Sequence, residues 1–154
     1  MKPPFARIAA VVLLSLPPAA PLAAQEPAQS PAVQMLQGRM QDFFQQLAEQ
    51  RTADAFQRLL QENPQLQKRA QAMIQRSDQL QRQYGRLVSF RRLQVRQLGP
   101  NLVVLQYLAE HQRLPVVWYA AFYRPPQSNA REEESWMVVQ LRLETDLHRA
   151  AFGR

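Results

Sequence analysis

Six aromatic residues between positions 107 and 136 form the densest group of side chains suited to binding. Successive side chains of an extended strand point to opposite faces, so Trp118 and Phe122 share one face while Tyr119 and Tyr123 share the other. One set must meet the core. The other set either forms cross-strand pairs or makes a ligand pocket or dimer surface. The candidate ligand-binding residues are therefore Tyr107, Trp118, Tyr119, Phe122, Tyr123 and Trp136.

Several classes of catalytic and cofactor site lack the residues that they need. The chain has no Cys and four Gly, which excludes disulfides and thiolate zinc sites and counts against a glycine-rich phosphate loop. No serine lies in a Gly-x-Ser-x-Gly elbow. His111 and His148 fall in a predicted turn and tail, and neither has an i,i+4 partner for a helical metal site. We expect no cofactor and no metal.

A second candidate surface is basic. Lys68, Arg69, Arg76 and Arg82 fall on one side of a helix predicted over 64–84, with glutamines between them. Such a face is either a solvated surface or a binding face for an anionic partner. The basic residues do not gather into a run and no nucleic-acid motif is present, so we expect no nucleic-acid partner.

Helices are predicted in the first half of the chain. The first begins at Met35, where an apolar stripe starts, formed by Leu36, Met40, Phe43, Phe44 and Leu47. A second covers 52–61, with Thr52 as its N-cap candidate, and buries Phe56, Leu59 and Leu60. The third starts at Asn63-Pro64 and stops at Tyr84-Gly85. Its apolar side contains Leu66, Ala70, Met73, Ile74, Ser77, Leu80 and Tyr84.

After Gly85 the hydrophobic period changes to that of strands, which are predicted over 87–98, 102–110, 116–123 and 136–143. The apolar parity of the first strand changes near Arg91-Arg92, which indicates a β-bulge. Short connections imply an antiparallel meander. The sequence therefore predicts an α+β fold over 35–146, in which three N-terminal helices pack on one face of a four-stranded antiparallel sheet.

The amino terminus has the layout of a secretory signal peptide. Lys2 and Arg7 precede an apolar run over 8–16, and small residues follow up to Ala24. That run is shorter than the ~20 residues needed to span a bilayer. We expect cleavage near Ala24, which lowers the formal net charge from +7 to +5, and a periplasmic or secreted bacterial protein that does not span the membrane. Residues 25–34 are predicted as a flexible lead-in and 147–154 as a tail.

Three segments carry a family resemblance: RQLGPNLVVLQY over 96–107, LPVVWYAAFYR over 114–124 and SWMVV over 135–139. With them the chain resembles small exported bacterial members of the nuclear transport factor two-like, or cystatin-like, superfamily of α+β rolls. The resemblance implies a curved sheet wrapped around the helices and a cone-shaped cavity. Some members use that cavity as an active site, and others serve as binding or dimerising modules.

The resemblance also implies a catalytic alternative, in which an Asp or Glu base lies beside a Tyr in the cone. Burial would raise the pKa of such a carboxylate and suit it to proton abstraction. The candidates are Asp42, Glu49 and Asp54, with Tyr107 or Tyr119. Nothing in the spacing selects one carboxylate, and a solvated helix charge is the alternative for each.

Three functions remain open. The favoured one is an exported, non-catalytic binding or dimerisation module that uses the aromatic sheet face or the cone-shaped cavity, with an apolar small molecule, a second copy or another protein as partner. The second is a small cofactor-free lyase or isomerase with a buried carboxylate base. The third is an envelope protein whose basic helix over 64–84 binds an acidic surface.

Overall fold

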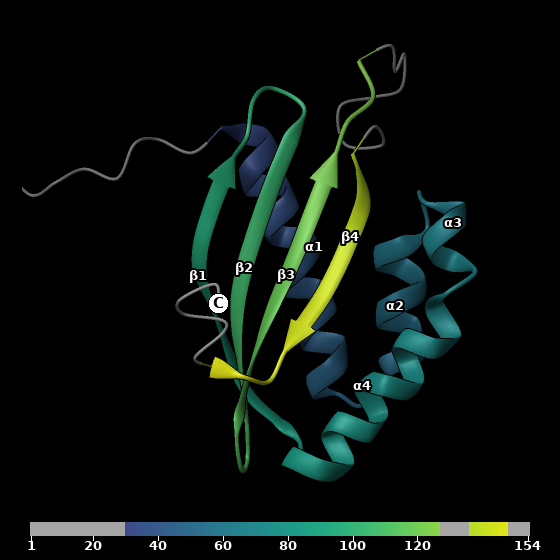
Figure 1. The fold of residues 1–154 in the computed structure, drawn as a ribbon, viewed down its shortest axis with the longest axis vertical. Coiled ribbons are helices and arrows are strands. Elements are labelled where there is room, and N and C mark those ends of the chain that lie inside the picture. The colour runs from purple at the N-terminus through teal and green to yellow at the C-terminus, as the bar shows by residue number, and fades with distance from the viewer. Residues whose placement is uncertain (1–29, 127–135, 148–154) are drawn as a thin grey trace, which may run out of the picture.

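The computed structural model describes residues 30–126 and 136–147. Helices precede strands along the chain, and the strands form one curved antiparallel sheet with the helices on one side (Figure 1). This confirms the predicted α+β class. The helices are α1 (Pro31–Ala48), α2 (Thr52–Leu60), α3 (Pro64–Gln67) and α4 (Ala70–Tyr84), and the strands are β1 (Leu87–Gln97), β2 (Leu102–His111), β3 (Pro115–Tyr123) and β4 (Met137–Glu144).

Helix α1 begins four residues before the predicted start at Met35. The side chain of Ser30 accepts a hydrogen bond from the Val33 amide, and Pro31 occupies the first helical turn, so these two residues make an ordinary helix start. Val33 is buried and extends the apolar stripe toward the N-terminus. Residues 31–34 therefore belong to the helix and not to the predicted flexible lead-in. The predicted stripe from Leu36 to Leu47 is buried as expected.

Helix α2 is capped by Arg51 and not, as predicted, by Thr52. The chain leaves α1 in a tight turn, in which Gln50 has a φ of 63° and the Arg51 amide donates to the Gln46 carbonyl over 2.8 Å. The Arg51 carbonyl then accepts the first bond of the new helix from Ala55. Thr52 is consequently inside the helix, where it is buried. The predicted apolar side of α2 is buried as well.

The predicted continuous helix over 64–84 is wrong, because it is divided into α3 and α4. Asn63 caps α3, with its Oδ1 accepting from the amides of Gln65 and Leu66, and its Nδ2 donates to the Val138 carbonyl of β4 over 2.7 Å. Helix α4 packs on α2. Both segments contact α2, and Asn63 in addition ties the start of α3 to β4. Gly85 ends α4 with a φ of 86°, as its stop signal predicted.

The strands run in the order β1-β2-β3-β4, so the predicted meander is confirmed. The predicted bulge is present, since the β1–β2 register shifts between Arg92 and Gln94. Two further register irregularities lie between Leu87 and Ser89 in the β1–β2 ladder and between Ala121 and Phe122 in the β3–β4 ladder.

Aromatic rings form the centre of the core between α1, α2 and the sheet. The Phe44 ring stacks on Phe90 with a centroid separation of 5.0 Å and lies 5.2 Å from Tyr107. The Phe43 ring makes edge contacts with Phe56 at 5.2 Å and with Trp118 at 5.6 Å. Where the family resemblance implies a cone-shaped cavity, the described part of the chain has closely packed rings.

Candidate functional site

The six candidate aromatic residues are divided between the two faces of the sheet. Four of them are core residues, at most 3% exposed: Tyr107, Trp118, Phe122 and Trp136. Tyr119 and Tyr123 are partly exposed on the outer face, which is the side of the sheet away from the helices. The Tyr119 hydroxyl accepts from Gln106 over 3.2 Å, and the Arg142 guanidinium lies 4.9 Å from the centre of its ring. Of the six, only Tyr119 and Tyr123 are accessible enough to form the predicted contact surface.

The three candidate carboxylates do not meet a tyrosine. Glu49 and Asp54 are exposed and form ion pairs with Arg51, at 3.6 and 3.1 Å. Asp42 is exposed on α1, while Tyr107 packs on Phe44 in the core and Tyr119 lies on the outer face. The arrangement of base and phenol that the resemblance implies is therefore not formed among these residues.

The four candidate basic residues are all exposed. Lys68 and Arg69 lie in the turn between α3 and α4, and Arg76 and Arg82 lie on α4, so the set spans two helices. Within residues 30–126 and 136–147, none of the four forms an ion pair.

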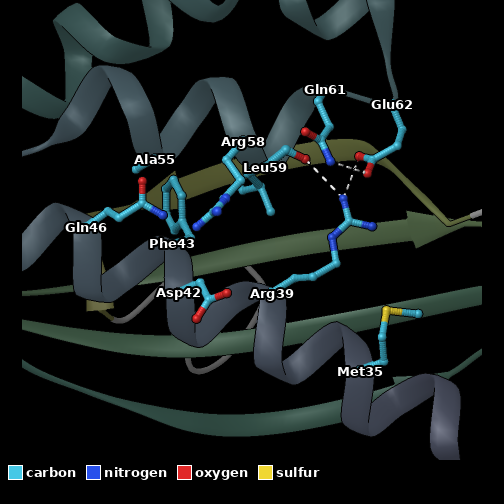
Figure 2. Close-up of a pocket in the computed structure, with 10 residues that line it drawn as sticks. All are labelled: Met35, Arg39, Asp42, Phe43, Gln46, Ala55, Arg58, Leu59, Gln61 and Glu62. Carbon is cyan, nitrogen blue, oxygen red and sulfur yellow. Dashed lines mark hydrogen bonds and ion pairs between the residues drawn. The ribbon is translucent and has the colours of Figure 1, made fainter. Parts of the chain in front are cut away.

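A groove of about 370 Å³ runs between α1 and α2 (Figure 2). Helix α1 presents Met35, Arg39, Asp42 and Gln46 to it, at steps of four, three and four residues, which place them on one side of a helix. From the other wall come Ala55, Arg58 and Leu59 of α2, followed by Gln61 and Glu62. We call this feature the α1–α2 groove.

Arg39 crosses the α1–α2 groove and is held by four groups. Its Nη2 forms an ion pair of 2.6 Å with the Glu62 carboxylate and donates to the Leu59 carbonyl over 3.4 Å. Its Nη1 donates to the Trp136 carbonyl over 2.7 Å, and its guanidinium lies 5.5 Å from the centre of the Phe122 ring. Figure 2 shows the side chain bridging from α1 to the end of α2. Arg39 therefore fixes the two helices against each other and against the sheet.

Three other polar residues of the groove have no such partners. Asp42 and Arg58 form no hydrogen bond or ion pair through their side chains with any residue that the structure describes. The Gln46 side-chain amide is likewise without a partner among the described residues, and its polar atoms keep contact with solvent although the residue as a whole is only 8% exposed. These side chains are thus free to bind a ligand.

The floor of the groove is apolar. Phe43, Ala55 and Leu59 line it and are each at most 3% exposed. An apolar floor with a few polar groups around it is the usual composition of a small-molecule site, and such sites measure about 300–1,000 Å³. The groove can therefore hold the apolar part of a small ligand and bind its polar groups at the walls.

The sequence does not predict this groove. The available signal was the spacing of Arg39, Asp42 and Gln46, which places three polar residues beside the buried stripe of α1. That spacing alone does not distinguish a groove from a solvated surface, because it does not say where α2 lies.

Comparisons with family models, with curated proteins and with solved structures found no match to the chain. Among the helices of the described ranges, none has the length and apolar character to cross a bilayer. No cluster of three or more His, Asp or Glu residues suited to a metal ion occurs in the same part of the chain.

Proposed function

We propose that the chain is an exported, non-catalytic binding module that holds a small molecule in the α1–α2 groove. The observation that carries the proposal is the combination of Asp42, Gln46 and Arg58, without partners in the described structure, above an apolar floor. The site differs from the predicted aromatic face and cone. The packed core supports this relocation, since most of the candidate aromatic side chains are buried in it.

Two features favour binding over catalysis. The groove is lined by no His, Tyr or Ser among the described residues, so Asp42 has no neighbour there to act as a proton donor or nucleophile. Asp42 is also exposed to solvent, whereas a carboxylate base at neutral pH usually depends on burial. These features support a role in holding the ligand.

Export is proposed from residues 1–24, which lie outside the described residues. Expression of the full chain in a Gram-negative host should place a form that begins at Gln25 in the periplasmic fraction, as read by N-terminal sequencing. An uncleaved chain in the cytoplasm would contradict export without affecting the groove. The resemblance to the nuclear transport factor two-like superfamily, like export, stays a prediction.

Small-molecule binding can be tested by thermal-shift screening of the purified protein. Compounds that raise the melting temperature should lose their effect in the variant Asp42→Ala/Arg58→Ala, because both free charges of the groove are removed. The matched control is Asp78→Ala/Arg69→Ala, which removes one acid and one base from the α3–α4 region. Compounds that stabilise both variants equally would place the binding site elsewhere.

A second candidate function is attachment to an acidic envelope surface. Lys68, Arg69, Arg76 and Arg82 are exposed and without ion pairs among the described residues, and Asp78 is the single acid in the sequence over 64–84. Attraction of this kind is screened by salt. The protein should then sediment with vesicles of anionic lipid at low salt, and Arg69→Glu/Arg76→Glu should abolish the effect. Sedimentation that is unchanged at high salt would eliminate this candidate.

A further inference from the structure

We propose that the ligand of the α1–α2 groove is a zwitterion of the amino-acid class, namely an apolar α-amino acid or a short peptide of such residues. This inference rests on the proposed function and names its ligand. It follows from the charges that line the groove, from the unpartnered amide of Gln46 and from the apolar floor.

The charged residues of the groove form two pairs of different character. Arg39 and Glu62 neutralise each other directly through their ion pair of 2.6 Å. Asp42 and Arg58 also have opposite signs, but they stand on opposite walls and form no ion pair with each other. Figure 2 shows Asp42 on α1 and Arg58 on α2, with no contact drawn between them. The groove therefore offers one negative and one positive charge that do not pair with each other.

This arrangement selects for a ligand with two charges. A simple cation would bind Asp42 and leave Arg58 without a partner, and a simple anion would do the reverse. A zwitterion places its ammonium group at Asp42 and its carboxylate at Arg58, which can hold a carboxylate through two parallel N–H donors. Each charge of the ligand then meets its opposite.

The remaining lining residues fit the rest of such a molecule. The Gln46 amide can both donate and accept, as a peptide group or a carboxylate requires. Phe43, Ala55 and Leu59 provide an apolar floor for an aliphatic or aromatic side chain. Met35 also lines the groove, and its unbranched thioether adapts to apolar groups of different shape. The groove thus favours apolar over charged side chains.

The test is calorimetric titration of the full-length protein with leucine, phenylalanine and leucyl-leucine. Each is compared with its N-acetyl derivative, which lacks the positive charge, and with its C-terminal amide, which lacks the negative charge. The parent compounds should bind at least tenfold more tightly than either derivative. Binding of both derivatives with the affinity of the parent would overturn the inference.

Two single variants make the test specific to each wall. Asp42→Asn should weaken binding of the parent at least tenfold. It should leave the affinity for the N-acetyl derivative unchanged, since that compound has no ammonium group to pair with Asp42. Arg58→Gln should likewise weaken binding of the parent at least tenfold but leave binding of the C-terminal amide unchanged, since that compound has no carboxylate. Asp78→Asn and Arg69→Gln are the matched controls and should change nothing. Equal losses for parent and derivatives in the groove variants would contradict the assignment of charges.

The outcomes separate this inference from the proposed function. If derivatives with one charge or none bind as well as the parent, and binding is still lost in Asp42→Ala/Arg58→Ala, the groove is a binding site but not for zwitterions. If none of the amino-acid compounds binds, the inference is wrong, and the thermal-shift screen decides about the groove. Both substituted residues are exposed, so the variants should keep the circular dichroism spectrum and melting temperature of the parent protein.

Discussion

Arg39 and Glu62 form an ion pair of 2.6 Å in which both side chains are about four-fifths buried, with exposed fractions of 19% and 20%. The two residues belong to different segments, since Arg39 lies in α1 and Glu62 follows α2. The guanidinium also reaches the carbonyl of Trp136, at the start of the last strand. One side chain thus connects three segments that are distant in sequence.

Replacing Arg39 by Met should lower the free energy of unfolding by about 3 kcal/mol, because it leaves the Glu62 carboxylate and two carbonyl groups without their charged donor. The matched control is Arg51→Met. Arg51 forms ion pairs with Glu49 and Asp54, but all three are more than half exposed, so its loss should cost less than about 1 kcal/mol. Urea denaturation measures both values, and equal losses would show that Arg39 does not connect the segments.

Gly85 should not tolerate a side chain. Its φ of 86° is unfavourable for other residues, and an added Cβ would lie 2.6 Å from Oε1 and 2.7 Å from Cβ of Gln112. Gly85→Ala should therefore destabilise the protein by about 2 kcal/mol in urea denaturation. Gly38→Ala is the control. Gly38 lies in α1 with nothing within 4 Å of an added Cβ, so this change should stabilise by about 0.5–1 kcal/mol.

His111 should make the protein less stable in mild acid. Burial lowers the pKa of its imidazole below the ordinary value of 6.5, and the hydrogen bond between Nδ1 and the Gly85 carbonyl opposes this shift only in part. The neutral ring donates its Nδ1 proton to that carbonyl. As the pH falls below 6.5, the unfolded chain takes up a proton before the folded protein does, so the contribution to stability present at pH 7.5 decreases.

Two measurements check this prediction. A pH titration followed by nuclear magnetic resonance should give the His111 ring a pKa below 6.5. Urea denaturation at pH 7.5 and at mildly acidic pH should show a smaller loss of stability in His111→Gln than in the parent protein, since the variant retains every other titrating group. An equal loss in both proteins would assign the acid sensitivity to other residues.

The two faces of the sheet should respond differently to the loss of an aromatic ring. Phe44 is fully buried against Phe90, Tyr107 and Trp118, so Phe44→Ala should cost about 3–5 kcal/mol. Tyr119 is partly exposed on the outer face, and Tyr119→Ala should cost about 1 kcal/mol. Urea denaturation measures the free energy of unfolding of both variants against that of the parent protein. A comparable cost for Tyr119 would mean that the outer face is covered as tightly as the core.

The sheet could be predicted from the sequence because its determinants are local. Short turns and a period of two specify an antiparallel meander, and the parity change at Arg91-Arg92 locates the bulge to within two residues of the observed shift. The same alternation separated Trp118 and Phe122 from Tyr119 and Tyr123. It could not say which pair faces the helices, because both sets are large and aromatic.

The break between α3 and α4 could not be predicted, because residues 64–84 have no Gly or Pro after Pro64 and are rich in good helix formers. The contact of Asn63 with Val138 is distant in sequence and decides the direction of α3. Arg39 is a similar case, since its partners include a carbonyl 97 positions away. Polar residues that act through distant contacts leave no periodic pattern, so the sequence gives no decisive signal for the groove.

The bridge made by Arg39 sets a limit on ligand length. Asp42, Gln46 and Arg58 line the groove on one side of this side chain, and Met35 lines it on the other (Figure 2). A compact guest can enter from the solvent side and lie across the groove. A ligand long enough to reach both Met35 and Asp42 would have to pass over the Arg39 side chain, which its ion pair with Glu62 holds in place, so a compact guest fits the groove better than a long acyl chain.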